Sequence, residues 1–178
     1  MSLPRVTEIL ENFVTGLSNI VAKSKVYSAY PSFTRPNDTN SYSAGDVVGT
    51  SPGANIEFTN MGVIGEDVFI TSVKLRIDVS SIPSGMGSFR LHLFNAAPTA
   101  IDDNSPFNLI AADRTKYIDF IDLDTPNDFG DTLFISANNV NIQTTLVSTS
   151  IFGVLETRAA YTPTAQAAKA IKMKAVGA

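Results

Sequence analysis

Most of this chain alternates between apolar and polar residues, a pattern that begins near Ile20 and continues almost to the C-terminus. The clearest example is the segment 72–79, where every second side chain is apolar. These side chains are Val73, Leu75, Ile77 and Val79. Successive side chains of a strand point to opposite faces, so this spacing predicts a strand with one buried face and one face in water. A chain patterned in this way is expected to fold into sheets.

The same reasoning predicts about eight to ten short strands along the chain. They cover residues 27–30, 46–48, 55–58, 72–79, 89–94, 117–123, 133–137, 142–147, 151–155 and 170–175. The connections are rich in Gly, Pro, Asn and Asp and carry no helical spacing, which argues against βαβ units. The predicted fold class is therefore all-β, an antiparallel two-sheet sandwich or barrel over residues 20–178. Long connections such as 95–106 suit Greek-key crossings, whereas 117–123 is apolar on both faces, which leaves its inward face open.

The first residues follow a different period. Five apolar side chains recur at i, i+3, i+4, i+7 and i+11, which is the stripe of an amphipathic helix. They are Val6, Ile9, Leu10, Phe13 and Leu17. Residues 1–19 are thus predicted to be an arm holding a helix of about 12 residues, which is marginal unless its stripe is covered. Its own domain or a neighbouring subunit could cover it. Because the strands can close a sandwich without the helix, we expect these five residues to bind a partner.

Charged residues make up only 17% of the chain, against roughly 25% in an average globular protein. The hydrophobic fraction of 44% is enough for a buried core, and the low charge indicates that partners cover part of the surface. The net charge is −4, and the 13 Lys and Arg residues occur singly along the sequence. Binding to a phosphate backbone needs clustered cations, so no direct contact with nucleic acid is expected.

The chain has no cysteine, which excludes disulfides, thiolate metal sites and cysteine nucleophiles. This composition suits a protein made in a reducing cytosol. The first residues lack the basic and then apolar layout of a signal peptide. No apolar stretch approaches the roughly 20 residues that span a bilayer, so no membrane partner is expected.

Catalytic residues are hard to find in this sequence. His92 is the one histidine, and we interpret it as a half-buried strand residue with a backbone partner, because a general base needs an oriented companion. Carboxylates cluster once, within residues 119–131. They are Asp119, Asp122, Asp124, Asp128 and Asp131. They could hold Ca²⁺, but their spacing is not that of an EF-hand, and Asp is common in turns. We therefore expect no catalytic residue, no metal, no cofactor and no enzymatic activity.

Several short segments, taken in order, resemble one protein family. They cover residues 42–49, 56–58, 73–77, 91–94 followed by Pro98, 152–155 and 160–163. In this order they are similar to the jelly-roll head decoration (cement) proteins of tailed bacteriophages, over roughly residues 26–175. The predicted N-terminal helix lies outside the resemblance.

The resemblance implies an antiparallel two-sheet jelly roll that forms a homotrimer on the outside of an icosahedral phage head. Such a virion protein would be made in the bacterial host cytoplasm and would clamp neighbouring major capsid proteins. Two other classes stay open: another virion jelly roll from a tail or fibre, or a host-surface carbohydrate-binding module. A fibre would more often carry a repetitive shaft segment, and a sugar-binding module would expose aromatic rings. A β-sandwich enzyme would need a pocket with convergent carboxylates or a metal.

Overall fold

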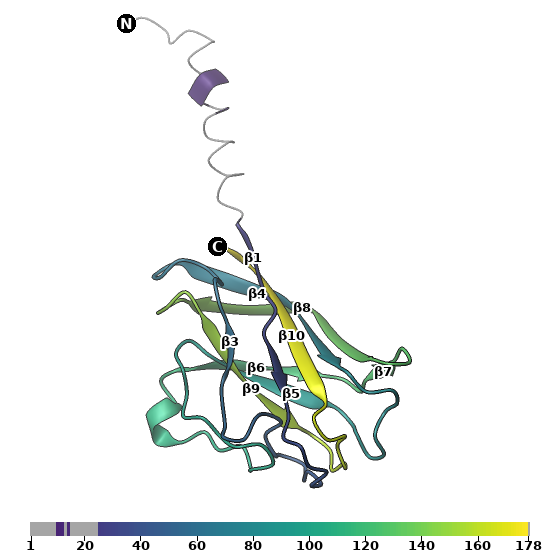
Figure 1. Ribbon diagram of the computed structural model, residues 1–178. Helices are drawn as coiled ribbons and strands as arrows, with labels where there is room; N and C mark the ends of the chain where they lie inside the picture. Colours follow the sequence, from purple (N-terminus) through teal and green to yellow (C-terminus); the bar gives the residue numbers. More distant parts are fainter. Residues whose placement is uncertain (1–9, 13, 15–24, 178) are drawn as a thin grey trace, which may run out of the picture.

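The computed structural model of the protein describes residues 10–12, 14 and 25–177, and two antiparallel sheets form its body (Figure 1). The six-stranded sheet contains β1 (Val26–Ala29), β2 (Ser32–Thr34), β4 (Asp67–Ile77), β7 (Asn127–Asp128), β8 (Leu133–Thr145) and β10 (Ala168–Gly177). The four-stranded sheet contains β3 (Ile56–Phe58), β5 (Phe89–Phe94), β6 (Tyr117–Leu123) and β9 (Ile151–Thr157). A single 3-10 turn, η1 (Ala111–Asp113), lies in the connection before β6. The prediction of an all-β sandwich is confirmed.

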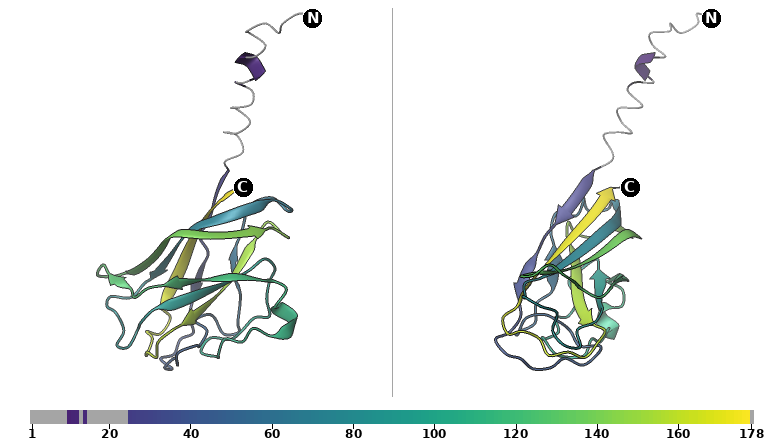
Figure 2. Two further views of the ribbon diagram at one scale, coloured as in Figure 1. Left: turned by 180° about the vertical axis from the view of Figure 1, so that it is seen from behind. Right: turned by 90° about the vertical axis from the view of Figure 1, so that its right-hand side faces the viewer.

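The strand order identifies the sandwich as a jelly roll. It is β1-β10-β4-β8-β7 in one sheet and β3-β9-β5-β6 in the other. Early strands lie beside late ones, β1 with β10, β3 with β9 and β4 with β8, and the series closes at the β5–β6 pair. The chain is therefore wound as one long hairpin folded across two sheets, which is the double Greek key of a jelly roll. Figure 2 shows the two sheets from behind and from the side.

The core fills the space between the sheets. Its largest contributions come from alternate residues of the long strands, which are buried as the sequence predicts. They include Val73, Leu75 and Ile77 of β4, Phe89, Leu91 and Leu93 of β5, and Ile171 and Met173 of β10. For β6 the inward residues are Ile121 and Leu123, because they stand opposite Leu91 and Phe89 on the same face of the sheet.

Several predicted elements differ from the structure. The strand expected at 72–79 is β4, which begins at Asp67 and ends at Ile77, and the turn expected at 124–131 contains β7. Residues 133–137 and 142–147 were expected as two strands, but β8 is one strand of 13 residues with an irregularity at Asn139, whose φ is 58°. A β-bulge of this kind shifts the register without ending the strand. The turn-rich stretch 31–40 contains β2, which pairs with β10. Residues 46–48 make two isolated bridges and no strand.

The outer face of the four-stranded sheet is covered, although alternation alone predicts a wet face. The connection from β5 to β6 folds over it and brings apolar side chains against Phe94 and Val154. The covering residues include Ile101, Phe107 and Leu109. The connection therefore packs on this sheet as a third layer. The polar side chains on the covered face are shielded from water.

Of the predicted partner-binding stripe, only Leu10 belongs to the described residues. It is helical and 55% exposed. Val6, Ile9, Phe13 and Leu17 lie outside them, as does the predicted boundary between residues 19 and 20. The arm and its binding role stay predictions. No helix within the described ranges is both long and apolar enough to cross a membrane.

Candidate functional site

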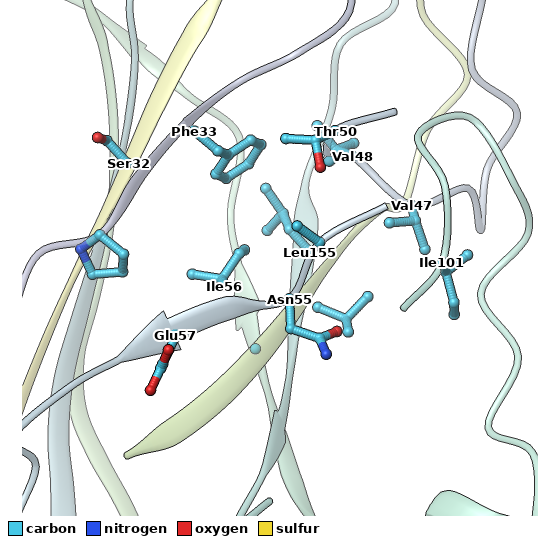
Figure 3. Close-up of a pocket in the computed structure, with 15 residues that line it drawn as sticks. Ser32, Phe33, Val47, Val48, Thr50, Asn55, Ile56, Glu57, Ile101 and Leu155 are labelled. Carbon is cyan, nitrogen blue, oxygen red and sulfur yellow. The ribbon is translucent and has the colours of Figure 1, made fainter. Parts of the chain in front are cut away.

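A pocket opens at one side of the sandwich, between the edges of the two sheets. It has a volume of about 390 Å³, and most of its lining is apolar (Figure 3). Phe33 of β2 and Ile56 of β3 face each other across it, and Leu155 also lines it, to their right in the view. The pocket exists because β2 and β3 end their sheets on this side without pairing to each other. Its size is near the lower end for small-molecule sites, and its lining suits an apolar group.

A buried ion pair lies beside this pocket. Arg35 Nη2 is 3.3 Å from Asp103 Oδ2, and the two side chains are 0% and 3% exposed. Tyr42 donates its hydroxyl to Asp103 Oδ1 at 2.6 Å, and the backbone N–H of Gly49 donates to the same atom at 2.9 Å. Arg35 also donates to the carbonyl of Thr164 at 3.3 Å. Three connections far apart in sequence are thus held together at this end of the sandwich.

Lys169 is the most deeply buried amine in the described part of the chain. It precedes Ile171 on β10 by two residues and so shares the inward face of that strand. Its ammonium lies 5.9 Å from the centre of the Phe33 ring. Burial, together with the positive charge of Arg35, lowers the pKa of Lys169 to about 7. Burial therefore favours the neutral form of the Lys169 amine.

His92 is buried on the outer face of the four-stranded sheet, beneath the covering connection. Its Nε2 lies 2.6 Å from Glu156 Oε2, its Nδ1 lies 3.2 Å from the Tyr117 hydroxyl, and the Phe107 ring stacks on it at 3.7 Å. Our expectation of a half-buried residue with a backbone partner was wrong, because both ring nitrogens have side-chain partners. Arg158 Nη1 holds the other oxygen of Glu156 at 2.8 Å. The arrangement is a closed structural network.

Burial lowers the pKa of His92 below its ordinary value of 6.5, against the opposite effect of Glu156. The neutral imidazole then donates from Nε2 to the carboxylate and accepts from Tyr117 at Nδ1. A histidine that stays neutral in the fold but ionises when unfolded stabilises the protein above the unfolded pKa, and this stability is lost as the pH falls.

We therefore expect the urea midpoint of unfolding to fall when the pH is lowered from about 7.5 to about 5.5, the range in which an unfolded histidine ionises. In His92→Gln the fall should be smaller, because Gln can still bond to Glu156 but has no proton to gain. Urea titrations at the two pH values measure this. An equal fall in both proteins would assign the pH dependence to other groups.

The carboxylates of the predicted cluster do not converge on one point within the described residues. No group of three or more potential ligands converges anywhere in the described ranges. Asp122 pairs with Arg90 at 2.7 Å, Asp119 accepts the N–H of Phe120, and Asp128 accepts that of Gly130, each 2.8 Å long. The last two are local bonds from side chain to backbone, as expected of Asp in turns, whereas Asp122–Arg90 is an ion pair between β6 and β5.

Lysines gather on the outer face of the six-stranded sheet, around a hollow of about 200 Å³. It is lined by Ser72, Val73, Lys74, Ser136, Asn138, Lys172 and Lys174. Lys74 stands directly opposite Lys172 in the β4–β10 register. We call this surface the lysine hollow. This group of lysines could not be predicted from the sequence, in which the basic residues are scattered. Residues 74 and 172 become neighbours only through strand pairing.

The outer edge of β8 is open. β7 pairs with Leu133 and Phe134 alone, so within the described chain no strand covers the edge beyond them. This edge carries no charge, since no Asp, Glu, Lys or Arg occurs between residues 132 and 155. The other edges are protected: β6 carries Asp119 and Asp122, β3 has three residues, and Pro31 interrupts the β1–β2 edge. Proteins usually guard a long edge with charge, proline or shortness.

No protein-family model matches the chain, and neither does any curated protein. Among solved structures it is similar to the capsid of Helicobacter pylori bacteriophage KHP30, at 12% identity over 86% of this chain and 89% of that chain, with a TM-score of 0.31. It is also similar to desmodium yellow mottle tymovirus, at 13% identity over 87% and 88%, with a TM-score of 0.28. A bacterial lipoprotein of Bacteroides thetaiotaomicron matches at 12% identity over 86% and 84%, with a TM-score of 0.29. These scores are low, so the identification of the jelly roll rests on strand order and pairing.

Proposed function

We propose that the protein is a structural, non-enzymatic virion protein that decorates the outside of an icosahedral phage head. In this role a homotrimer binds neighbouring major capsid proteins and clamps them together. A partner that binds the folded shell and not its separated subunits stabilises the shell by mass action. Clamping therefore requires binding surface alone and no chemical step.

The segments that carry the resemblance to decoration proteins support this role. Residues 56–58 are β3, and residues 73–77, 91–94 and 152–155 lie within β4, β5 and β9. They thus contribute to both sheets of the jelly roll. Residues 42–49 hold Tyr42 and Gly49, which donate two of the hydrogen bonds to the buried Asp103. The segments that carry the resemblance thus build the two sheets and the buried ion pair. This fits a protein with a structural role.

The observation that carries the proposal is the open edge of β8. An exposed strand edge binds an extended segment of another chain through main-chain hydrogen bonds. With no charge on this edge, nothing repels an incoming strand. We propose that an extended segment of the capsid protein pairs there.

The test is co-sedimentation with assembled heads of the phage that encodes the chain. Asn141→Lys places a charge on the open edge of β8 and should weaken head binding about tenfold or more, since lysine is a common guard of strand edges. Asn108→Lys, on an exposed loop, is the matched control and should bind as the unmodified protein does. If the unmodified protein stays in the supernatant, the decoration role is wrong. If it sediments but Asn141→Lys binds equally well, only the assignment of the edge is wrong.

Removing residues 1–19 tests the proposed role of the arm. Burial of its five apolar side chains would contribute roughly 1.5–3 kcal/mol each before ordering costs. If they dock on another molecule, the truncated protein should keep its melting temperature and lose self-association or head binding. Calorimetry and sedimentation measure the two properties separately. A truncated protein that unfolds or aggregates would place the helix in the domain core.

A further inference from the structure

The lysine hollow holds three positive charges that no carboxylate of the described residues neutralises. Lys74 and Lys172 are opposite each other, and Lys174 stands opposite Ser72 in the same register. Like charges directly opposite on paired strands repel, so this arrangement is unfavourable in an isolated subunit. None of the three lysines forms an ion pair within the described residues, whereas nearby Arg76 is paired with Asp78 at 3.0 Å. The hydroxyls of Ser72 and Ser136 add further hydrogen-bond donors around the hollow.

The complementary charge is present in the same chain. The turn between β6 and β8 exposes Asp124, Asp128 and Asp131, and none of them has an ion-pair partner in the described part of the protein. Between the last two lies Phe129, which is 71% exposed. We call residues 124–131 the acidic tip. At the edge of the six-stranded sheet, the tip is carried by β7, the short strand that pairs with the start of β8 (Figure 1).

The two surfaces belong to the same side of the subunit. The Phe134 ring on β8 lies 4.0 Å from the Lys74 ammonium and 5.7 Å from the centre of the Phe129 ring. Yet no carboxylate of the tip lies within ion-pair distance of a lysine of the hollow in the described structure. Each subunit therefore presents an unneutralised positive surface and an unneutralised negative surface next to each other.

We propose that the lysine hollow binds the acidic tip of a second copy of this chain. Asp128 and Asp131 would pair with Lys74, Lys172 and Lys174, and the exposed Phe129 would be covered by the neighbouring subunit. A contact between two different surfaces of identical chains can close into a ring, such as the proposed trimer. The inference rests on the proposed self-association and is independent of binding to heads.

Nucleic acid is a weaker candidate for this site than a second copy. The protein has a net charge of −4, and three lysines on one face are few for a phosphate backbone. A second copy supplies as many free carboxylates as there are free lysines. The contact also removes the repulsion between Lys74 and Lys172, because each gains an opposite charge.

Charge reversal tests the contact on the purified protein without heads, by sedimentation velocity over a range of concentrations. Lys74→Glu/Lys172→Glu and Asp128→Lys/Asp131→Lys should each weaken self-association about tenfold or more, because each places like charges in the contact. The protein with all four changes should associate again, because the charges are then exchanged and not lost. Added salt should weaken the unmodified complex. The matched control is Arg114→Glu, an exposed cation after η1 without an ion-pair partner in the described chain, which should associate normally.

All four positions are exposed, and circular dichroism melting checks that each variant is folded. Recovery of association in the fourfold variant would support the contact, since no general loss of charge produces it. A monomeric unmodified protein, an unchanged complex in both double variants, or a fourfold variant that stays dissociated would each overturn the proposal. Binding of a short single-stranded DNA that is lost in Lys74→Glu/Lys172→Glu alone would also overturn it, by assigning the hollow to phosphate. Failure of head binding with intact self-association would overturn only the decoration role.

Discussion

Replacing Asp103 with alanine should lower the free energy of unfolding by about 3–5 kcal/mol, the range for a buried ion pair that loses one partner. Among the described residues, the change leaves the fully buried Arg35 with Asp38, whose side chain is 36% exposed, as its one remaining ion-pair partner. It also removes the acceptor of the Tyr42 hydroxyl and of the Gly49 N–H. Buried donors without an acceptor add to the cost. Urea denaturation at neutral pH measures the loss.

Asp119→Ala is the matched control for this prediction. Asp119 is exposed and bonds only to the N–H of the residue that follows it. Its removal should change stability by less than about 0.5 kcal/mol. If the two variants lose the same stability, the ion pair does not hold the three connections together.

Leu75→Ala should lower the free energy of unfolding by about 2–5 kcal/mol, because it removes buried apolar surface and leaves a cavity in the core. Leu75 is 0% exposed and lies in the C-terminal part of β4, opposite Ile171 of β10 on one side and Ile135 of β8 on the other. Because Ile171 and Ile135 are fixed within β10 and β8, they can shift little to fill the cavity that the substitution leaves. Calorimetric or urea-induced unfolding gives the difference.

Lys74→Ala, one residue earlier on the same strand, controls for the strand itself. It should change stability by less than about 0.5 kcal/mol, since its side chain lies outside the core. The lost contact with Phe134 is offset by relief of the repulsion from Lys172. Equal losses at both positions would contradict the assignment of the two faces.

Period-two alternation predicted several strands well, although β4 begins at Asp67 and not at residue 72. The bounds expected for 89–94 and 117–123 agree with β5 and β6, and the inward residues of β4 and β5 are the predicted ones. Alternation predicts these positions correctly because burial of every second side chain stabilises the strand and fixes which of its faces points inward. It failed for β8, where Asn139 absorbs a bulge while hydrogen bonds to β4 continue on both sides. A pattern read residue by residue cannot distinguish a bulge from a turn.

The candidate surfaces were harder to predict, because strand pairing creates them. Lys169 lies on the same face of the strand as Ile171 and Met173, because alternate residues face the same side. If the predicted strand 170–175 had been extended to residue 168, where β10 begins, it would have placed Lys169 in the core. No local signal predicts the Arg35–Asp103 pair, whose members are 68 residues apart. The Lys74–Lys172 neighbourhood depends equally on the β4–β10 register.

By itself, the sequence determined the all-β class, the inward faces of the main strands and the weakly charged surface, because these depend on local patterning and composition. The tertiary structure alone decided which strands are neighbours, and hence the lysine hollow and the open edge of β8. Its strand order confirms the jelly roll that the resemblance implied. It also decided that His92 would be buried, since a connection folds over the outer face of its sheet. Burial of a side chain depends on what covers it, and the cover comes from segments distant in sequence.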